Sequence, residues 1–162
     1  MEKEGGMNIP KLIVSVVICQ IAGFIGYIFT RPAIPTWYAS LGKPFFTPPD
    51  WVFGPVWIIL YILMGIAASL VWQKGLGQKQ SRNALIFFGI QLVLNALWPF
   101  LFFGLKSPIA GLIEIVVLGV AILLTIGKFL EVSRAAGILL VPYFLWVSFA
   151  SGLNLSIWYL NC

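Results

Sequence analysis

The chain has 162 residues, of which 60% are hydrophobic and only 9% are charged, and its mean hydropathy is +1.00. A soluble domain usually carries about 25% charged residues, because its surface faces water. So few charges cannot cover a water-exposed surface, and the composition therefore excludes an ordinary soluble protein. The basic residues behind the net charge of +5 stand singly between apolar runs, which leaves no basic patch for binding nucleic acid.

Five apolar segments are long enough to cross a membrane, whose hydrocarbon core takes about 20 helical residues. They show neither the polar stripe of an amphipathic soluble helix nor the alternation of a β-barrel strand. We therefore predict an all-α membrane protein, a five-helix bundle that forms one domain over residues 1–162. Pro55, Pro99 and Pro142 should kink their spans, because each removes a backbone donor. The predicted spans are residues 12–29, 51–72, 84–103, 108–129 and 135–159.

The connection between the first two spans, residues 30–50, is long and rich in proline. Trp37, Tyr38, Phe45 and Phe46 make it too aromatic for a disordered segment. We expect an ordered lid over one end of the bundle, with Phe45 and Phe46 packed on its mouth. The alternative is a plain connector that its aromatic side chains hold at the membrane interface.

Alternate loops share a side of the membrane, and most of the ten basic residues fall on the side of the N-terminus. The positive-inside rule then predicts a cytoplasmic N-terminus if the protein is in a plasma membrane. The proline-rich loop and the C-terminus would lie on the opposite side. The basic residues on the N-terminal side are Lys3, Lys11, Lys74, Lys79, Arg82, Lys128 and Arg134, and those opposite are Arg31, Lys43 and Lys106.

Trp51 opens the second predicted span beneath the long connection, and the other six of the seven tryptophans fall into two groups by their depth in the spans. Trp57 and Trp146 lie deep, where anchoring indoles are least expected. Together with Tyr61, Tyr143 and Phe149 they either line a cavity for a flat apolar ligand or simply pack the core. The tryptophans near span ends, which an aromatic belt explains, are Trp37, Trp72, Trp98 and Trp158.

Few polar groups lie inside the spans, and such groups are expensive there. Glu114 is the only acidic residue well inside a span, where it is protonated, faces a wet cavity or lies at a subunit contact. Gln91 and Asn95 stand one helical turn apart and suit bonds between helices. The chain has no histidine, and Cys19 and Cys162 form no metal-binding motif, so we expect neither a metal site nor a cofactor.

Three stretches occur in this order along the chain: WYASLGKPFFTPPDWVFGPVWIILY, QLVLNALWPFLFFG and VPYFLWVSFASGLN. With five spans and this length, they resemble the TspO/translocator protein family, also called tryptophan-rich sensory proteins or peripheral-type benzodiazepine receptors. The resemblance covers the chain from Leu12 to Tyr159. It implies a five-helix bundle, often a homodimer, with a pocket near the first loop.

In this family the pocket binds tetrapyrroles such as protoporphyrin IX, isoquinoline-type ligands and, in animal members, cholesterol. Those ligands are what the resemblance implies for this chain. The positions that match the ligand-binding residues of the family are Ala22, Gly26, Trp51, Val52, Trp57, Asn95, Trp98, Trp146, Ala150 and Leu153.

Two positions depart from the animal members. Ala110 stands where they carry a tryptophan that helps to wall the pocket. Tyr159 is followed by no lysine or arginine, so the weak pattern associated with cholesterol contact is incomplete. We therefore expect a bacterial member, and we do not expect cholesterol as its physiological ligand.

Three functions compete, and we rank them in this order. The first is porphyrin binding in tetrapyrrole or stress sensing, with Arg31 or Lys43 meeting the propionates. The second is light- and oxygen-dependent porphyrin degradation, in which Trp57 and Trp146 would be the catalytic electron donors in place of acid–base groups. The third is transport of tetrapyrroles or lipids, which ranks last because five helices cannot divide into equal repeats.

Overall fold

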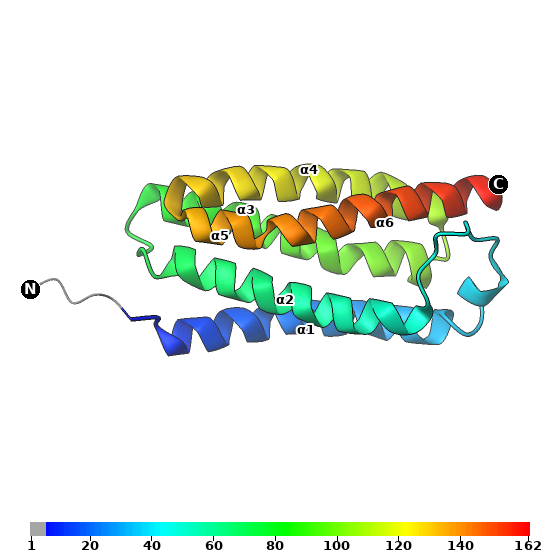
Figure 1. Cartoon of the computed structure of the whole chain (residues 1–162), viewed down its shortest axis with the longest axis horizontal. Coiled ribbons are helices and arrows are strands. Elements are labelled where there is room, and N and C mark those ends of the chain that lie inside the picture. The colour runs from blue at the N-terminus through cyan, green and yellow to red at the C-terminus, as the bar shows by residue number, and fades with distance from the viewer. Residues whose placement is uncertain (1–5) are drawn as a thin grey trace, which may run out of the picture.

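The protein is an antiparallel helical bundle, seen here in a computed structural model that describes residues 6–162 (Figure 1). In this part of the chain five helical stretches are long and apolar enough to span a membrane. They confirm the predicted all-α, five-span architecture. The elements are α1 (Ile9–Ala33), η1 (Tyr38–Ser40), α2 (Asp50–Trp72), α3 (Lys79–Pro99), the π-helix η2 (Phe100–Gly104), α4 (Pro108–Val132), α5 (Arg134–Leu139) and α6 (Val141–Leu160).

Polar residues followed by proline set the starts of two spans. The Asn8 side chain accepts a hydrogen bond from the Lys11 amide at the start of α1, and the Ser107 hydroxyl accepts one from the Ala110 amide at the start of α4. Each helix also has a proline in its first turn. The ring fixes φ at a helical value, and the missing backbone N–H costs nothing there, because N–H groups of the first turn have no partner within the helix.

The prolines inside the spans act differently from one another. Pro142 follows a break, because α5 ends at Leu139 and α6 begins at Val141. Pro99 ends α3, and the π-helix η2 continues the span. By contrast, α2 continues as one α-helix through Pro55. The strongest effect therefore occurs at Pro142, where the span divides into two helices.

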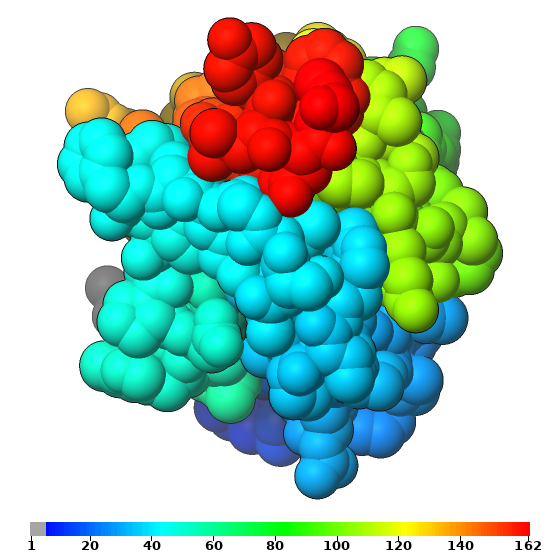
Figure 2. All heavy atoms as spheres, turned by 90° about the vertical axis from the view of Figure 1, so that its right-hand side faces the viewer, coloured from blue at the N-terminus to red at the C-terminus, as the bar shows by residue number. Residues whose placement is uncertain are grey.

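The first connection covers residues 34–49 and lies at the end of the bundle that also carries the C-terminus, here called the loop end (Figure 1). The connection is ordered, as predicted: Tyr38 is only 4% exposed and packs on the rings of Phe102 and Phe103. The expected packing of Phe45 is wrong, because its side chain is fully exposed, whereas Phe46 contacts the ring of Phe149. Figure 2 views the loop end, where atoms of this connection meet those of α6.

Two buried clusters hold the helices together. The larger one joins α1, α2, α3, α4, α5 and α6 through side chains such as Met64, Ile122 and Tyr143. The smaller one lies near the loop end, around Phe102 and Leu153. The span termini alternate between the two ends, consistent with the order of loops assumed for the charge prediction, although Lys3 lies outside the described residues.

Candidate functional site: an aromatic cavity near the loop end

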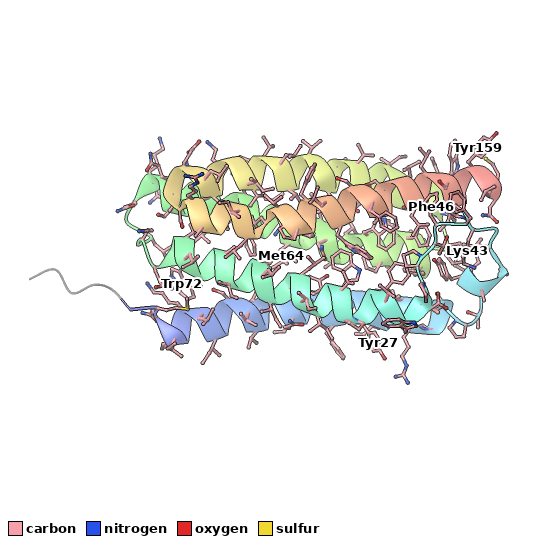
Figure 3. All side chains as sticks on the ribbon, viewed as in Figure 1. Tyr27, Lys43, Phe46, Met64, Trp72 and Tyr159 are labelled. Carbon is pink, nitrogen blue, oxygen red and sulfur yellow. The ribbon has the colours of Figure 1, made fainter. Side chains whose placement is uncertain are left out.

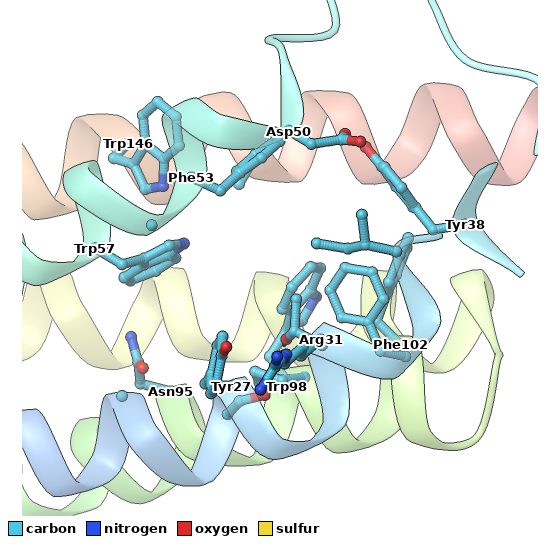
Figure 4. A pocket seen from close by; sticks show the side chains of 18 of the residues that line it. Tyr27, Arg31, Tyr38, Asp50, Phe53, Trp57, Asn95, Trp98, Phe102 and Trp146 are labelled. Atoms are coloured by element: carbon cyan, nitrogen blue, oxygen red, sulfur yellow. Dashed lines mark hydrogen bonds between the residues drawn. The ribbon is translucent and has the colours of Figure 1, made fainter. Parts of the chain in front are cut away.

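A cavity of about 770 Å³ lies in the half of the bundle nearest the loop (Figure 4). Members of both buried clusters line it, and its walls come from α1, α2, α3, η2, α4, α6 and the first connection. This volume falls within the range of about 300–1,000 Å³ that is typical of small-molecule sites. The cavity is therefore large enough to take a ligand.

Four indoles line the cavity: those of Trp51, Trp57, Trp98 and Trp146. Trp57 stacks on Tyr61 with ring centroids 5.5 Å apart, and Trp146 meets the ring of Phe53 edge-on at 6.0 Å. Packed aromatic neighbours fix the rings of Trp57 and Trp146, so their faces and edges form a preformed apolar surface, whereas Trp51 is 75% exposed. Such a surface suits a flat π-rich molecule, because aromatic rings attract one another in stacked and edge-to-face arrangements.

Trp98 lies inside the bundle, which corrects its assignment to an aromatic belt. Its ring stacks on Phe102 at 4.8 Å, and its indole N–H donates to the Asn154 side-chain oxygen at 3.1 Å. The Asn154 amide in turn donates to the Pro108 carbonyl at 2.8 Å. This chain of bonds links α3, α6 and α4 at the cavity wall, which Trp98 and Asn154 both line, and it holds the Trp98 indole in one orientation.

A second polar group joins α2, α3 and α6. Tyr61 donates its hydroxyl to the Asn95 side-chain oxygen, and the Asn95 amide donates to the Tyr143 hydroxyl at 2.7 Å. Tyr143 then donates to the Gln91 oxygen at 2.8 Å. Tyr61 and Asn95 also line the cavity and give its mainly apolar interior a polar spot, and Gln20 and Asn154 are further polar lining residues.

Charge is confined to the mouth of the cavity. Of the described residues that line it, only Arg31 and Asp50 are charged, and both are exposed at helix ends near the loop. The Arg31 guanidinium lies 5.8 Å from the centre of the Tyr27 ring. Burial, with a smaller contribution from Asp50, raises the pKa of Tyr38 to about 12, so this loop hydroxyl stays neutral at physiological pH.

The structure places most of the sequence-predicted site residues on the cavity wall. Ala22 and Val52 are the exceptions: Ala22 is buried within the bundle and Val52 is partly buried, and neither lines the cavity. Ala110, the position of the animal tryptophan, does not line it either. The predicted residues that do line it are Gly26, Trp51, Trp57, Asn95, Trp98, Trp146, Ala150 and Leu153.

The sequence motifs missed several lining residues on other helices. Tyr61 was considered as a possible lining residue and does line the cavity, whereas Tyr143 and Phe149 do not. Nothing in the sequence singles out Ile115 or Leu118 from the other aliphatic residues of α4. The further lining residues that were not predicted include Tyr27, Phe53, Gly54, Phe102, Phe103 and Ile157.

Several buried polar groups have no hydrogen-bond partner among the described residues, and Glu114 and Trp146 carry two of them. Both carboxyl oxygens of Glu114 lack one, and this residue is only 6% exposed, so it faces the bundle interior. It is absent from the cavity lining. The indole nitrogen of Trp146 also lacks a partner and is itself buried, although Trp146 lines the cavity.

Comparison with known proteins identifies relatives over nearly the whole chain. A tryptophan-rich protein TspO from Archaeoglobus fulgidus is 48% identical over 155 residues, covering 96% of this chain and 99% of that protein. A TspO from Chlorobaculum tepidum is 45% identical, covering 95% and 98%. The human translocator protein is 37% identical, covering 83% and 80%. The pattern of the TspO/MBR family matches residues 15–160, and the chain accordingly belongs to that family of multi-pass membrane proteins.

Proposed function

We propose that this protein binds porphyrins in the indole-lined cavity and acts in tetrapyrrole or stress sensing. The observation that carries the proposal is the set of four indoles around a preformed space of about 770 Å³. A porphyrin is flat, apolar and π-rich, so it gains from both area burial and ring contacts in such a space. Isoquinoline-type ligands share these properties and should compete for the same space.

The charges at the mouth support the same ligand class. A porphyrin such as protoporphyrin IX carries propionate groups, and Arg31 lies at the cavity edge with its guanidinium exposed. An arginine–carboxylate pair there would be charge-assisted and bidentate. Lys43 is less available, because its ammonium lies 4.6 Å over the Tyr38 ring and donates to the Leu41 carbonyl.

A second candidate function is light- and oxygen-dependent degradation of the bound porphyrin. Trp57 and Trp146 both line the cavity, and either could supply an electron to an excited ligand in contact with it. Trp98 also lines the cavity, but its N–H is bonded to Asn154 and its ring joins α3 to α6.

We also propose how the protein is assembled and oriented in the membrane. We expect residues 1–162 to act as a single domain in the membrane, as a homodimer surrounded by lipid, with its N-terminus in the cytoplasm if the membrane is a plasma membrane. The basic residues around the second and fourth connections support this orientation.

Replacing Trp146 with Phe tests the site. Loss of the indole contact should cost about 0.5–1.5 kcal/mol of binding energy, so the dissociation constant for protoporphyrin IX should rise about two- to tenfold. The measurement is a titration of purified protein in the dark, followed by the shift of the main porphyrin absorbance band. Trp72→Phe is the matched control, since Trp72 lies at the opposite end of the bundle beside Lys11 (Figure 3).

The same titration under illumination in air separates the two candidate functions. A stable shifted band indicates binding alone, and steady loss of the band that stops in Trp57→Phe indicates degradation. Equal weakening by Trp146→Phe and Trp72→Phe, or no band shift with the unaltered protein, would contradict the proposed site.

A further inference from the structure

The wall of the cavity is open on the side between α1 and α2. Phe24 and Tyr27 on α1 and Ile58 on α2 line the cavity, yet 62%, 50% and 54% of their respective surfaces are exposed on the outside of the bundle. Figure 3 shows Tyr27 projecting from α1 away from the other helices. A side chain that both lines a cavity and faces outward marks a place where the cavity reaches the surface. This surface lies within the membrane-spanning helices.

Two glycines of α2 show how the helix separates from α1. A methyl group added at Gly65 would lie 2.5 Å from the Cα of Val16, so the two backbones touch there. A methyl group added at Gly54 would meet no described atom within 4 Å, although Gly54 lines the cavity. Between these positions the Gln20 amide donates to the Ile58 carbonyl at 3.2 Å. The helices therefore pack tightly far from the loop and leave a gap near it.

The end of the bundle, by contrast, is covered. The Asn161 side chain accepts from the Gly42 amide and donates to the Gly42 carbonyl, both at 2.9 Å, which fastens the loop to the end of α6. The buried Tyr38 ring fixes the same loop to η2. A ligand passing under the loop would have to break these contacts, whereas one passing between α1 and α2 would not.

We propose that ligands enter the cavity sideways from the lipid, through an opening between α1 and α2 bounded by Phe24, Tyr27, Gly54 and Ile58, the lateral portal. The ligand class that fits is a membrane-dissolved flat amphiphile carrying a carboxylate. Its apolar body travels in hydrocarbon while its carboxylate stays at the interface near Arg31, which lies one turn, about 6 Å, beyond Tyr27 along α1. The ligand's identity rests on the proposed function, but the portal itself does not.

The first experiment uses lipid alone and needs no porphyrin. Lipids with brominated acyl chains quench indoles that they touch. In such bilayers the unaltered protein should lose Trp57 emission, measured as the difference from Trp57→Phe. Gly54→Leu should protect this component, because leucine fills the portal and suits a helix. Gly127→Leu is the matched control, since a methyl group there meets no described atom and Gly127 is outside the cavity lining.

The second experiment measures the kinetics of protoporphyrin IX exchange from vesicles. Gly54→Leu should slow both association and dissociation at least about fivefold, because a narrowed passage raises the barrier in both directions. Asn161→Ala loosens the loop and should leave both rates within about twofold of the unaltered protein. Circular dichroism should show that all variants retain the helical content of the unaltered protein.

The outcomes separate the portal from the proposed function. If the unaltered protein fails to take up porphyrin, the proposed function is wrong, and the brominated lipids still decide the portal. If Trp57 emission is not quenched by these lipids, or if Gly54→Leu leaves the quenching unchanged, the portal is overturned. It is also overturned if Asn161→Ala accelerates exchange while Gly54→Leu has no effect, since ligands would then pass under the loop.

Discussion

Asn95 uses one carboxamide to hold two tyrosines on two other helices. Its oxygen accepts from Tyr61 and its nitrogen donates to Tyr143, while the side chain is only 3% exposed. In lipid such bonds cannot be replaced by water, although their measured worth is often only about 0.6 kcal/mol. What is expensive is leaving one buried partner unpaired, which costs about 1–3 kcal/mol.

Because an unpaired buried group costs more than a lost hydrogen bond, substitutions of Asn95 and Tyr61 should have different effects alone and together. Asn95→Leu should destabilise the protein by about 1–3 kcal/mol, because the Tyr61 hydroxyl then loses its acceptor. Adding Tyr61→Phe removes the unpaired donor and should recover part of the loss. Thermal unfolding in detergent, compared across the two single variants and the double variant, measures the coupling. Additive losses would mean that the Tyr61–Asn95 bond contributes nothing of its own.

The individual residues of the cavity could be predicted only in part. Trp57 and Trp146 stand out in the sequence because indoles are unexpected at their depth, and family motifs indicated Asn95 and Trp98. Ile115 and Leu118 carry no such signal. Their helix is apolar nearly all round, so the sequence does not indicate which face turns inward. That rotation is set by packing against the neighbouring helices.

Two glycines of α2 differ in how closely their surroundings pack against them. Gly65 lets α1 and α2 touch backbone to backbone, which is how small residues bring membrane helices together. Gly54, eleven positions earlier in the same helix, faces open space. The same residue type therefore has two roles, a contact at one position and an opening at the other.

Alanine at each glycine should separate these roles. Gly65→Ala should destabilise the protein by about 1–3 kcal/mol, because the added methyl group overlaps the Val16 backbone and the helices must move apart. Gly54→Ala should be neutral or slightly stabilising, since alanine is the better helix former and nothing is in its way. The measurement is the unfolding midpoint of both variants under identical detergent conditions. A similar midpoint for the two would mean that α1 and α2 are not in close contact at Gly65.

The elements themselves were largely predictable, because a hydropathy scale detects the need for an apolar surface in lipid. The boundaries of the helices were harder to predict. The helix α1 continues past the predicted end at Phe29 to Ala33, since a backbone can remain helical through polar residues at the interface. The π-helix after Pro99 was not predicted, because local hydrogen-bond geometry leaves no trace in hydropathy.

Across the whole molecule, charge is distributed unevenly between the two ends of the bundle. Six described basic residues lie at the end opposite the loop end: Lys11, Lys74, Lys79, Arg82, Lys128 and Arg134. Arg31, Lys43 and Lys106 are the basic residues toward the loop end. This imbalance favours retention of the opposite end in the cytoplasm. In the orientation proposed above, the lateral portal would lie in the outer leaflet if the membrane is a plasma membrane.

The orientation can be tested with the native cysteines, because Cys162 is exposed at the C-terminus and Cys19 is buried in α1. In sealed right-side-out vesicles, a membrane-impermeant maleimide should label Cys162 from the outside. Protease added to the same vesicles should leave the connection at Lys74 and Lys79 intact, because that connection faces the enclosed space. The variant Cys162→Ser should take up no label and thereby show that Cys19 is silent. Labelling only after the vesicles are opened would reverse the orientation, and the portal would then draw its ligands from the inner leaflet.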